Sequence, residues 1–332
     1  MPCSLSVIIP TYQRCASVER ALKSLAQQTI PPHAYEVIVS IDGSQDGTRE
    51  MVAEFPAPYE LRGIWQPNRG RAAACNAGIR AARGEVIVLL DDDMEAAPAF
   101  LAAHLSAHSV GPRLGVMGAV PIHLDRSSPP VVAYVGAKFN EHLQKLAQPG
   151  YHFKLRDFYS GNFSIRRQVL LDVGLFDEAF KAYGNEDLEL SLRLTRAGVE
   201  LIYNHEALAH QYYSKDFAGL ARDNIAKGRT AVLLASKHPE AFHDLKLGMY
   251  GQGSRKWRLL RAGLLSASQR WSGTTEWLIA FMGWIEQRRP ARLPLYYALA
   301  LDYCYWSGVG SALRENRRAG QGLASLRRGS WR

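Results

Sequence analysis

Cysteine is scarce in this sequence, and long apolar runs are missing. The 332 residues include only four cysteines, Cys3, Cys15, Cys75 and Cys304. None of them forms a Cys-x-x-Cys pair, so a zinc ribbon or a dithiol redox motif has no support. No stretch of 18 clean apolar residues occurs, which excludes an obvious bundle of membrane spans. With 47% hydrophobic and 21% charged residues, the chain is predicted to fold as one large α/β domain, or as one with an appendage.

The first residues also lack a basic segment before their apolar run, which extends only from Leu5 to Pro10. A secretory signal peptide needs both features, so none is predicted. We therefore expect a cytoplasmic location in which the cysteines stay reduced.

The net charge of +9 is concentrated at the C-terminal end. From Gly251 to Arg332 there are 14 Lys and Arg but only 4 Asp and Glu, whereas residues 1–250 carry 26 basic and 27 acidic groups. Six of the seven tryptophans also lie there: Trp257, Trp271, Trp277, Trp284, Trp306 and Trp331. This pattern predicts a near-neutral body, 1–250, and a basic, Trp-rich helical tail, 251–332. We expect the tail to bind an anionic membrane surface without spanning it, so that the protein is peripheral on the inner face of the cell membrane. The alternative is that the tail only packs on the body.

Strand and helix signals alternate over the first 125 residues. Apolar runs at 5–9, 36–41, 61–65 and 85–90 predict strands, and the Ala-rich segment 71–83 predicts a helix. This alternation is typical of a doubly wound sheet, which binds ligands at the carboxyl ends of its strands. Polar residues follow three of those ends: Thr11, Asp42 and the run Asp91 to Asp93. A simple turn also explains Asp42-Gly43-Ser44, but it explains three consecutive aspartates poorly.

The pattern weakens after residue 125. The segment 125–148, interrupted by Ser127-Ser128-Pro129-Pro130, is expected to be a loop or an insertion on the acceptor side. A regular secondary-structure pattern returns at 159–165. The run Gly184 to Asp187 is predicted to open a helix, and another helix is predicted over 216–237.

Three adjacent carboxylates at a strand end repel one another unless a cation neutralises them. Mg²⁺ and Mn²⁺ prefer such oxygen ligands, and both ions also bridge phosphate oxygens. The cluster Asp91 to Asp93 therefore predicts a divalent metal, with a nucleoside diphosphate as a natural partner.

At this point the sequence resembles the family 2 glycosyltransferases, which have the GT-A fold. The resemblance rests on the order and spacing of seven segments: 7–14, 42–48, 68–78, 91–93, 161–167, 174–178 and 184–187. It implies a GT-A type mixed sheet with a Rossmann-like, nucleotide-sugar-binding half, 1–125, and an acceptor half with the catalytic base, 126–250. The implied activity is inverting transfer of a sugar from a nucleoside-diphosphate sugar, UDP-linked by preference, in polysaccharide or glycolipid biosynthesis.

The resemblance also implies roles for single residues. Pro10, Thr11 and Asp42 would line the base pocket, with Arg69 and Arg71 facing the base or diphosphate. Asp91 and Asp92 would hold the ribose and sugar, and Asp93 would ligate the metal together with His210. Asp187 would be the catalytic base, with Glu186 beside it.

Two departures refine the prediction. Ile41 stands where relatives often have the first Asp of an Asp-Asp-Gly-Ser run, although the second, Asp42, is present. The Gln-x-x-Arg-Trp motif of processive synthases is absent, which favours a single addition to a hydroxyl of a glycan, lipid-linked or small-molecule acceptor.

Three other functions are compatible with parts of the sequence. A Rossmann oxidoreductase is excluded, because no Gly-x-Gly-x-x-Gly follows the first strand. A metal-dependent nucleotide-sugar phosphohydrolase and a non-catalytic, basic module that binds membrane or nucleic acid remain alternatives. Nucleic acid is not expected as the principal ligand, because the body is near neutral. Arg229 could reach a phosphate or could lie on a solvated helix face.

Overall fold

The structure, a computed structural model, describes residues 4–271 and 273–318. The chain forms two compact units. The first unit runs to Leu124 and also contains Gly136–Lys181 and Glu186–Tyr213. The second unit contains Asp125–Val135, Ala182–Asn185 and the chain from Ser214 onward. The functional division into 1–125, 126–250 and 251–332 stays a prediction.

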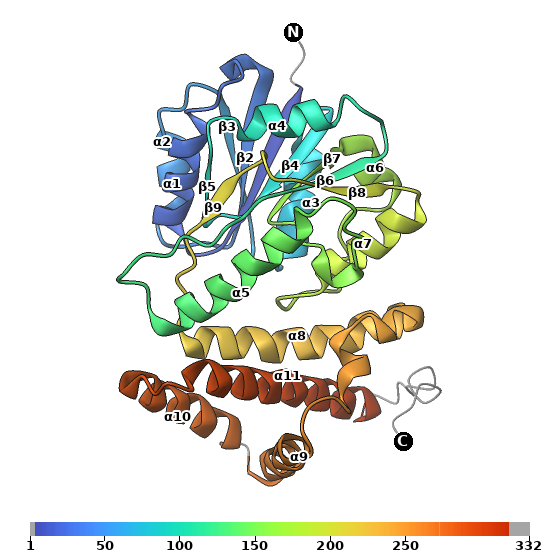
Figure 1. The fold of residues 1–332 in the computed structure, drawn as a ribbon. Helices are drawn as coiled ribbons and strands as arrows, with labels where there is room; N and C mark the ends of the chain where they lie inside the picture. Colours follow the sequence, from blue (N-terminus) through green and yellow to red (C-terminus); the bar gives the residue numbers. More distant parts are fainter. Residues whose placement is uncertain (1–3, 272, 319–332) are drawn as a thin grey trace. The chain divides into compact units, whose positions relative to one another are not determined.

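The first unit is built on a seven-stranded mixed sheet (Figure 1). Its strands are β1 (Leu5–Thr11), β2 (Tyr35–Asp42), β3 (Glu60–Gln66), β4 (Val86–Leu90), β6 (Leu114–Gly118), β7 (Asn162–Arg166) and β8 (Glu200–Asn204), in the spatial order β3-β2-β1-β4-β7-β6-β8. Strands β3, β2, β1 and β4 are parallel, and β7 runs antiparallel to both β4 and β6. A separate antiparallel pair joins β5 (Met94–Ala96) to β9 (Ala209–Gln211). The predicted α/β fold with a mixed sheet is confirmed.

Helices cover both faces of this sheet, because its central strands are apolar on both sides. The helical segments up to residue 196 are α1 (Cys15–Leu25), η1 (Pro32–Ala34), α2 (Thr48–Glu54), α3 (Arg71–Ala81), α4 (Phe100–Ala107), α5 (Pro130–Leu146), η2 (Leu155–Asp157), α6 (Arg167–Asp172) and α7 (Glu186–Arg196). One core joins Val7 and Ile9 of β1 to Leu22 of α1, and the other joins Ile8 to Ile79 of α3. The sheet is therefore a rigid support for its loops.

The expected loop at 125–148 is instead the helix α5 from Pro130 onward. Pro130 is its first residue, a position that proline favours because its fixed φ suits the first turn and its missing N–H has no helical partner there. Val131 and Val132 near its start, and Leu143 and Leu146 at its end, are buried. The proline pair that suggested a chain break therefore marks the start of a helix.

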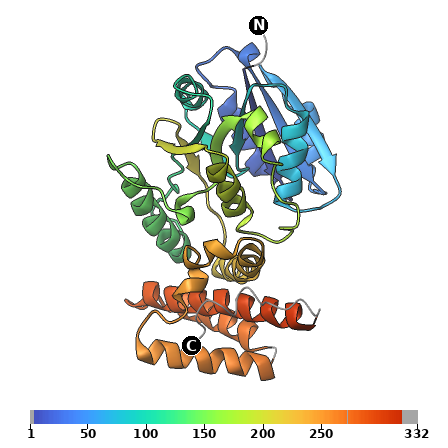
Figure 2. The same cartoon turned by 90° about the vertical axis from the view of Figure 1, so that its right-hand side faces the viewer.

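The second unit is helical. From Ser214 on it contains α8 (Phe217–Lys237), η3 (Pro239–His243), η4 (Lys246–Met249), α9 (Arg255–Arg270), α10 (Thr274–Arg288) and α11 (Leu293–Arg318). Helix α11 packs against α8 on one side and against α9 and α10 on the other (Figure 1 and Figure 2). Across 4–271 and 273–318, no helix has the length and apolar character needed to span a bilayer.

Two glycines set the close packing of α8 against α11. A methyl group on Gly228 would overlap the carbonyl oxygen of Tyr305, and one on Gly308 would overlap that of Ile225. Beside this contact, Arg229 donates to the Ser311 hydroxyl at 3.1 Å. Arg229 also forms an ion pair with an acidic side chain of α11. Arg229 is therefore engaged in helix packing, which neither of the two sequence interpretations anticipated.

This contact makes a stability prediction. Gly308→Ala and Gly228→Ala should each lower the free energy of unfolding by about 1–3 kcal/mol or more, because a methyl group meets backbone atoms that cannot rotate away. Gly283→Ala is the matched control, since nothing lies within 4 Å of its added methyl. The control should be neutral or gain up to about 1 kcal/mol from helix propensity. Thermal unfolding of the three variants tests this, and equal melting temperatures would contradict the packing argument.

Candidate active site

The carboxyl ends of β1, β2 and β4 meet at one edge of the sheet, as their parallel arrangement requires. The hydroxyl of Thr11, the last residue of β1, donates to Asp92 Oδ2 at 2.7 Å. Pro10 precedes it in the buried strand, paired with Ser40 of β2. The end of β1 and the aspartate cluster, some 80 positions apart in the sequence, are therefore joined at the sheet edge where a ligand is predicted to bind.

The segment 42–48 organises the loops around this edge through three of its side chains. Ser44 Oγ accepts from the backbone N–H of Gln13, and Asp46 Oδ2 accepts from that of Cys15, both at 2.9 Å. Gly43 has φ +81°, and a methyl group there would lie 2.8 Å from the backbone nitrogen of Asn68. A glycine is needed for both reasons.

Asp42 is the third of these side chains, and it holds the segment 66–70. Its Oδ1 accepts from Gln66 Nε2 at 2.7 Å and from the Arg69 N–H at 2.9 Å. Its Oδ2 accepts from the Gly70 N–H at 2.8 Å. The Arg69 side chain points elsewhere, to an ion pair with Glu178 at 2.7 Å. Asp42 therefore has a structural role, while its Oδ2 keeps capacity for one further N–H.

Part of the negative charge of the aspartate cluster after β4 is balanced by Arg14, a residue that the sequence did not single out. Arg14 Nη1 lies 3.4 Å from Asp92 Oδ1 and 3.3 Å from Asp93 Oδ2. Burial raises the pKa of Asp92 to about 7, although the Arg14 charge acts in the opposite direction. Burial and the neighbouring Asp91 charge likewise raise the pKa of Asp93. A cluster with raised pKa values is one that a bound cation would stabilise in its ionised form.

Arg71, at the start of α3, joins the aspartate cluster to the start of α7. Its Nη2 donates to Asp91 Oδ1 at 2.7 Å, and its Nη1 donates to the Ser160 hydroxyl at 3.0 Å. The same Nη1 lies 3.7 Å from Glu186 Oε1. The predicted donor-side and acceptor-side residues of the first unit are thus linked through one guanidinium group.

Glu186 and Asp187 open α7, as predicted from the sequence. Glu186 is buried, and its Oε2 has no hydrogen-bond partner. Burial and the adjacent Asp187 charge raise the pKa of Glu186, although Arg71 opposes them. Asp187 is only partly buried, and its Oδ1 accepts from the Leu188 N–H at 2.8 Å. Of the two carboxylates, Asp187 is therefore the more accessible to a substrate.

The structure does not bring His210 to Asp93. Gln211 lies there instead, with its Nε2 3.3 Å from both Asp93 carboxylate oxygens. His210 is the preceding residue of β9, and successive side chains of a strand point to opposite faces. The His210 side chain therefore points away from the face that Gln211 occupies, and it is exposed. Within the described ranges, no three His, Cys, Asp or Glu side chains gather closely enough to hold a metal ion by themselves. A metal at Asp93 would complete its coordination with water or phosphate oxygens.

A buried polar network links β7 to α4 next to the aspartate cluster. The Asn162 amide nitrogen donates to two backbone carbonyl oxygens at 2.8 and 3.1 Å, so its oxygen accepts from His104 Nε2 at 2.8 Å. His104 Nδ1 then accepts from the Ser164 hydroxyl, which in turn accepts from His108 Nε2, both at 2.8 Å. Burial lowers the pKa of each histidine to about 4, so both are neutral at pH 7. The network holds β7 in place beside Asp91, whose N–H donates to the Gly161 carbonyl.

An acidic cluster at the end of a parallel strand, a loop segment held by Asp42 and a helix that opens with two carboxylates form the arrangement that the sequence predicts for a family 2 glycosyltransferase of the GT-A fold. Residues 6–174 match the family described as Glycosyl transferase family 2, and residues 141–215 match the N-terminal domain of galactosyltransferase. The chain belongs to glycosyltransferase family 2.

Two curated relatives illustrate the similarity. The chain is 30% identical over 271 residues to the uncharacterized glycosyltransferase YfnE of Bacillus subtilis (strain 168), covering 67% of this chain and 68% of the relative. It is 30% identical over 227 residues to validoxylamine A glucosyltransferase of Streptomyces hygroscopicus subsp. limoneus, covering 61% of this chain. The match spans 50% of that relative's length.

Solved structures share the fold. The mannosyltransferase PcManGT from Pyrobaculum calidifontis, in complex with GDP-Man and Mn²⁺, superimposes with a TM-score of 0.57 at 22% identity, covering 92% of this chain and 87% of that one. TarS 1-349 of S. aureus superimposes with a TM-score of 0.55 at 18% identity, covering 96% of this chain and 93% of that one. These likenesses concern the fold.

Proposed function

We propose that this enzyme transfers one sugar at a time, with inversion, from a UDP-sugar to a hydroxyl of a glycan, lipid-linked or small-molecule acceptor. The observation that carries the proposal is the link from Asp91 through Arg71 to Glu186. It joins the residues that would hold the donor to those that would activate the acceptor. A phosphohydrolase or a non-catalytic module has no need of this arrangement, and the family match does not favour either of them.

The hydrogen bonds of Asp42 support uracil as the base. Its Oδ1 already accepts two N–H groups and its Oδ2 accepts one, which leaves room for a single further donor. Uracil presents one N–H on the edge that faces such a carboxylate. Guanine presents two adjacent donors, which suit a carboxylate with both oxygens open. Among the solved structures, TarS has been observed with UDP and UDP-GlcNAc, whereas PcManGT holds GDP-Man.

In the proposed reaction, the Asp187 carboxylate accepts the proton of the acceptor hydroxyl. The hydroxyl oxygen then forms a bond to the anomeric carbon on the face opposite the diphosphate, and the bond from that carbon to the diphosphate oxygen breaks. Arg71, which is held by its ion pair with Asp91, would contribute a fixed positive charge beside the diphosphate. Attack opposite the leaving group inverts the configuration at the anomeric carbon.

The residues fit a divalent ion of the Mn²⁺ or Mg²⁺ type, with Asp93 as the protein ligand. The buried carboxylates with raised pKa values and the present use of Arg14 as their counter-charge support this assignment. When bound, the ion would act as a Lewis acid that neutralises charge on the departing diphosphate. The proposed ligand set contains Asp93 and leaves out His210.

We further propose that the enzyme lies peripherally on the cytoplasmic face of the membrane. This position would suit a lipid-linked acceptor in glycolipid or polysaccharide synthesis. The charge of 251–332 supports it, although residues 319–332, including Trp331, lie outside the described part of the chain.

A thermal-shift panel of nucleoside diphosphates, with and without Mn²⁺, tests the donor assignment. A ligand that binds the native state stabilises it by RT ln(1 + [L]/Kd), so at equal concentration a tighter ligand gives a larger rise in melting temperature. UDP with Mn²⁺ should give the largest shift, ahead of GDP, ADP and CDP. A larger shift with GDP would overturn the base assignment, and no shift with any nucleotide would overturn the proposed function. Release of UMP and sugar 1-phosphate from a UDP-sugar without an acceptor would favour a phosphohydrolase.

A further inference from the structure

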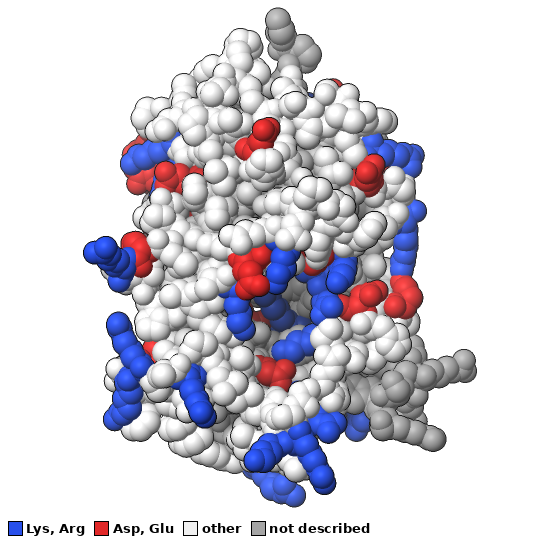
Figure 3. All heavy atoms as spheres, in the orientation of Figure 1, with Lys and Arg blue, Asp and Glu red and all other residues white. Residues whose placement is uncertain are grey.

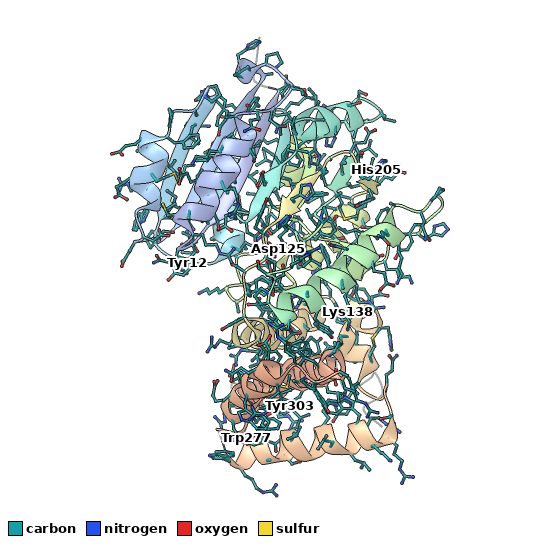
Figure 4. The ribbon with its side chains drawn as sticks, turned by 60° about the vertical axis from the view of Figure 1, so that its left-hand side comes forward. Tyr12, Asp125, Lys138, His205, Trp277 and Tyr303 are labelled. Atoms are coloured by element: carbon teal, nitrogen blue, oxygen red, sulfur yellow. The ribbon has the colours of Figure 1, made fainter. Side chains whose placement is uncertain are left out.

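The tryptophans of the C-terminal helices divide into two groups. Trp306 is buried, with 3% of its surface exposed, and Trp257 is half-buried and donates to Asp302 at 2.9 Å. Trp277 and Trp284 of α10 are instead 52% and 49% exposed. Figure 4 shows Trp277 pointing away from the helices while Tyr303 lies among them. Packing within the second unit therefore accounts for Trp306 and Trp257. It does not account for the exposed tryptophans of α10.

On α10 the exposed aromatic residues form one continuous ridge. Trp277 stacks on Phe281 with ring centroids 5.2 Å apart, and Phe281 stacks on Trp284 at 5.6 Å. Phe281 is itself 38% exposed. The Arg288 guanidinium lies over the Trp284 ring, 3.4 Å from its centroid, and ends the series. Spacings of four, three and four residues place all these side chains on one face of the helix. The aromatic ridge, 277–288, is thus ordered before any partner binds.

The helical segment that contains the aromatic ridge is rich in positive charge. From 255 to 292, eight Lys and Arg residues accompany only two acidic ones, Glu276 and Glu286. Glu286 is engaged internally, accepting from the Tyr297 hydroxyl at 2.5 Å. The exposed cations of this stretch are Arg255, Lys256, Arg258, Arg270, Arg288, Arg289 and Arg292. In Figure 3, Lys and Arg side chains gather over the region of the C-terminal helices. Any partner that covers the ridge must tolerate or neutralise this charge.

We propose that the aromatic ridge of α10 is a membrane-docking surface for bilayers that contain anionic lipids. Aromatic side chains at the headgroup level and cations that meet anionic headgroups are the two components of interfacial binding. A second copy of this chain is the weaker candidate, because a symmetric contact would bring two equally basic surfaces together without a counter-charge. Trp277, Phe281 and Trp284 would contact lipid directly. This docking surface rests on the proposed peripheral position of the enzyme and is independent of the transfer chemistry.

Vesicle sedimentation of the full chain tests the docking surface. We expect pelleting with vesicles of equal phosphatidylglycerol and phosphatidylcholine at low salt, and little with phosphatidylcholine alone. The triple variant Trp277→Ala/Phe281→Ala/Trp284→Ala should bind the mixed vesicles at least about tenfold more weakly, because it removes the inserted apolar surface. Trp65→Ala, which removes an equally exposed tryptophan (47%) from β3, is the matched control and should bind like the wild type.

A second pair of measurements keeps the inference testable if the triple variant is unstable. Trp277→Phe/Trp284→Phe should still pellet but should lose most of the fluorescence quenching that brominated lipids cause in the wild type. The UDP-induced thermal shift, measured on each preparation, reports the donor site separately. Equal pelleting of the triple variant and the wild type would overturn the inference. So would failure of the wild type to bind, or a wild-type dimer that the triple variant converts to monomer.

Discussion

Asp187→Asn should lower kcat for sugar transfer by about 10²–10⁴-fold, the range expected for loss of a general base. The amide keeps the shape of the side chain, and its oxygen can still accept the Leu188 N–H, so α7 should begin as before. Nucleotide affinity should remain nearly unchanged, because Asp187 lies on the acceptor side of the proposed site. Steady-state kinetics together with titration calorimetry of UDP would separate the two effects.

Asp172→Asn is the matched control for this prediction. It makes the same carboxylate-to-amide change at an exposed position in the last turn of α6. Its kcat should equal that of the wild type. Retention of a tenth or more of wild-type kcat by Asp187→Asn would remove Asp187 from the role of base, and the neighbouring Glu186 would become the residue to test.

Asp93→Ala should abolish the part of UDP affinity that depends on Mn²⁺. The substitution removes the proposed protein ligand of the metal while leaving Thr11 and Asp42 to hold the nucleoside. Folding should survive, because loss of one buried carboxylate also relieves its repulsion of Asp91 and Asp92. Titration calorimetry with UDP, in the presence and absence of Mn²⁺, measures the difference.

His210→Ala provides the comparison that the structure suggests. Its side chain points to the opposite face of β9 from Gln211, so the Mn²⁺-dependent affinity for UDP should stay at the wild-type level. A loss as large as that of Asp93→Ala would restore His210 to the ligand set. Unchanged Mn²⁺ dependence in Asp93→Ala would remove Asp93 from it.

Much of the fold could be predicted from the sequence, because the signals are local. The strand ending at Leu90 is a continuous apolar run followed by three aspartates, and a buried parallel strand is the structure that such a run favours. The convergence of Thr11, Asp42 and the aspartate cluster followed from the parallel strand order alone. The start of α7 at Glu186 was likewise visible, since acidic residues favour the first turn of a helix.

The contacts that the sequence did not predict are those that depend on side-chain direction. His210 and Gln211 are neighbours on one strand, and a shift of one residue exchanges the faces to which they point. Arg14 meets Asp93 across 79 positions of sequence, a contact that no local pattern encodes. A hint was nevertheless present, because three clustered carboxylates require a cation and Arg14 belongs to the loop that follows β1. At Pro130, a loop and a helix start share the same residues, so composition could not separate them.

The buried hydrogen-bond network from Asn162 to His108 also restricts which substitutions this sequence can accept during evolution. Each proton between Asn162 and His108 has one possible direction, since the amide nitrogen of Asn162 is committed to two carbonyl groups. Reversing any one bond would require every other bond in the series to reverse. A single exchange at His104 or Ser164 would leave a buried donor or acceptor without a partner. These positions should therefore vary together among homologous sequences, and an engineered replacement should change the whole group in one step.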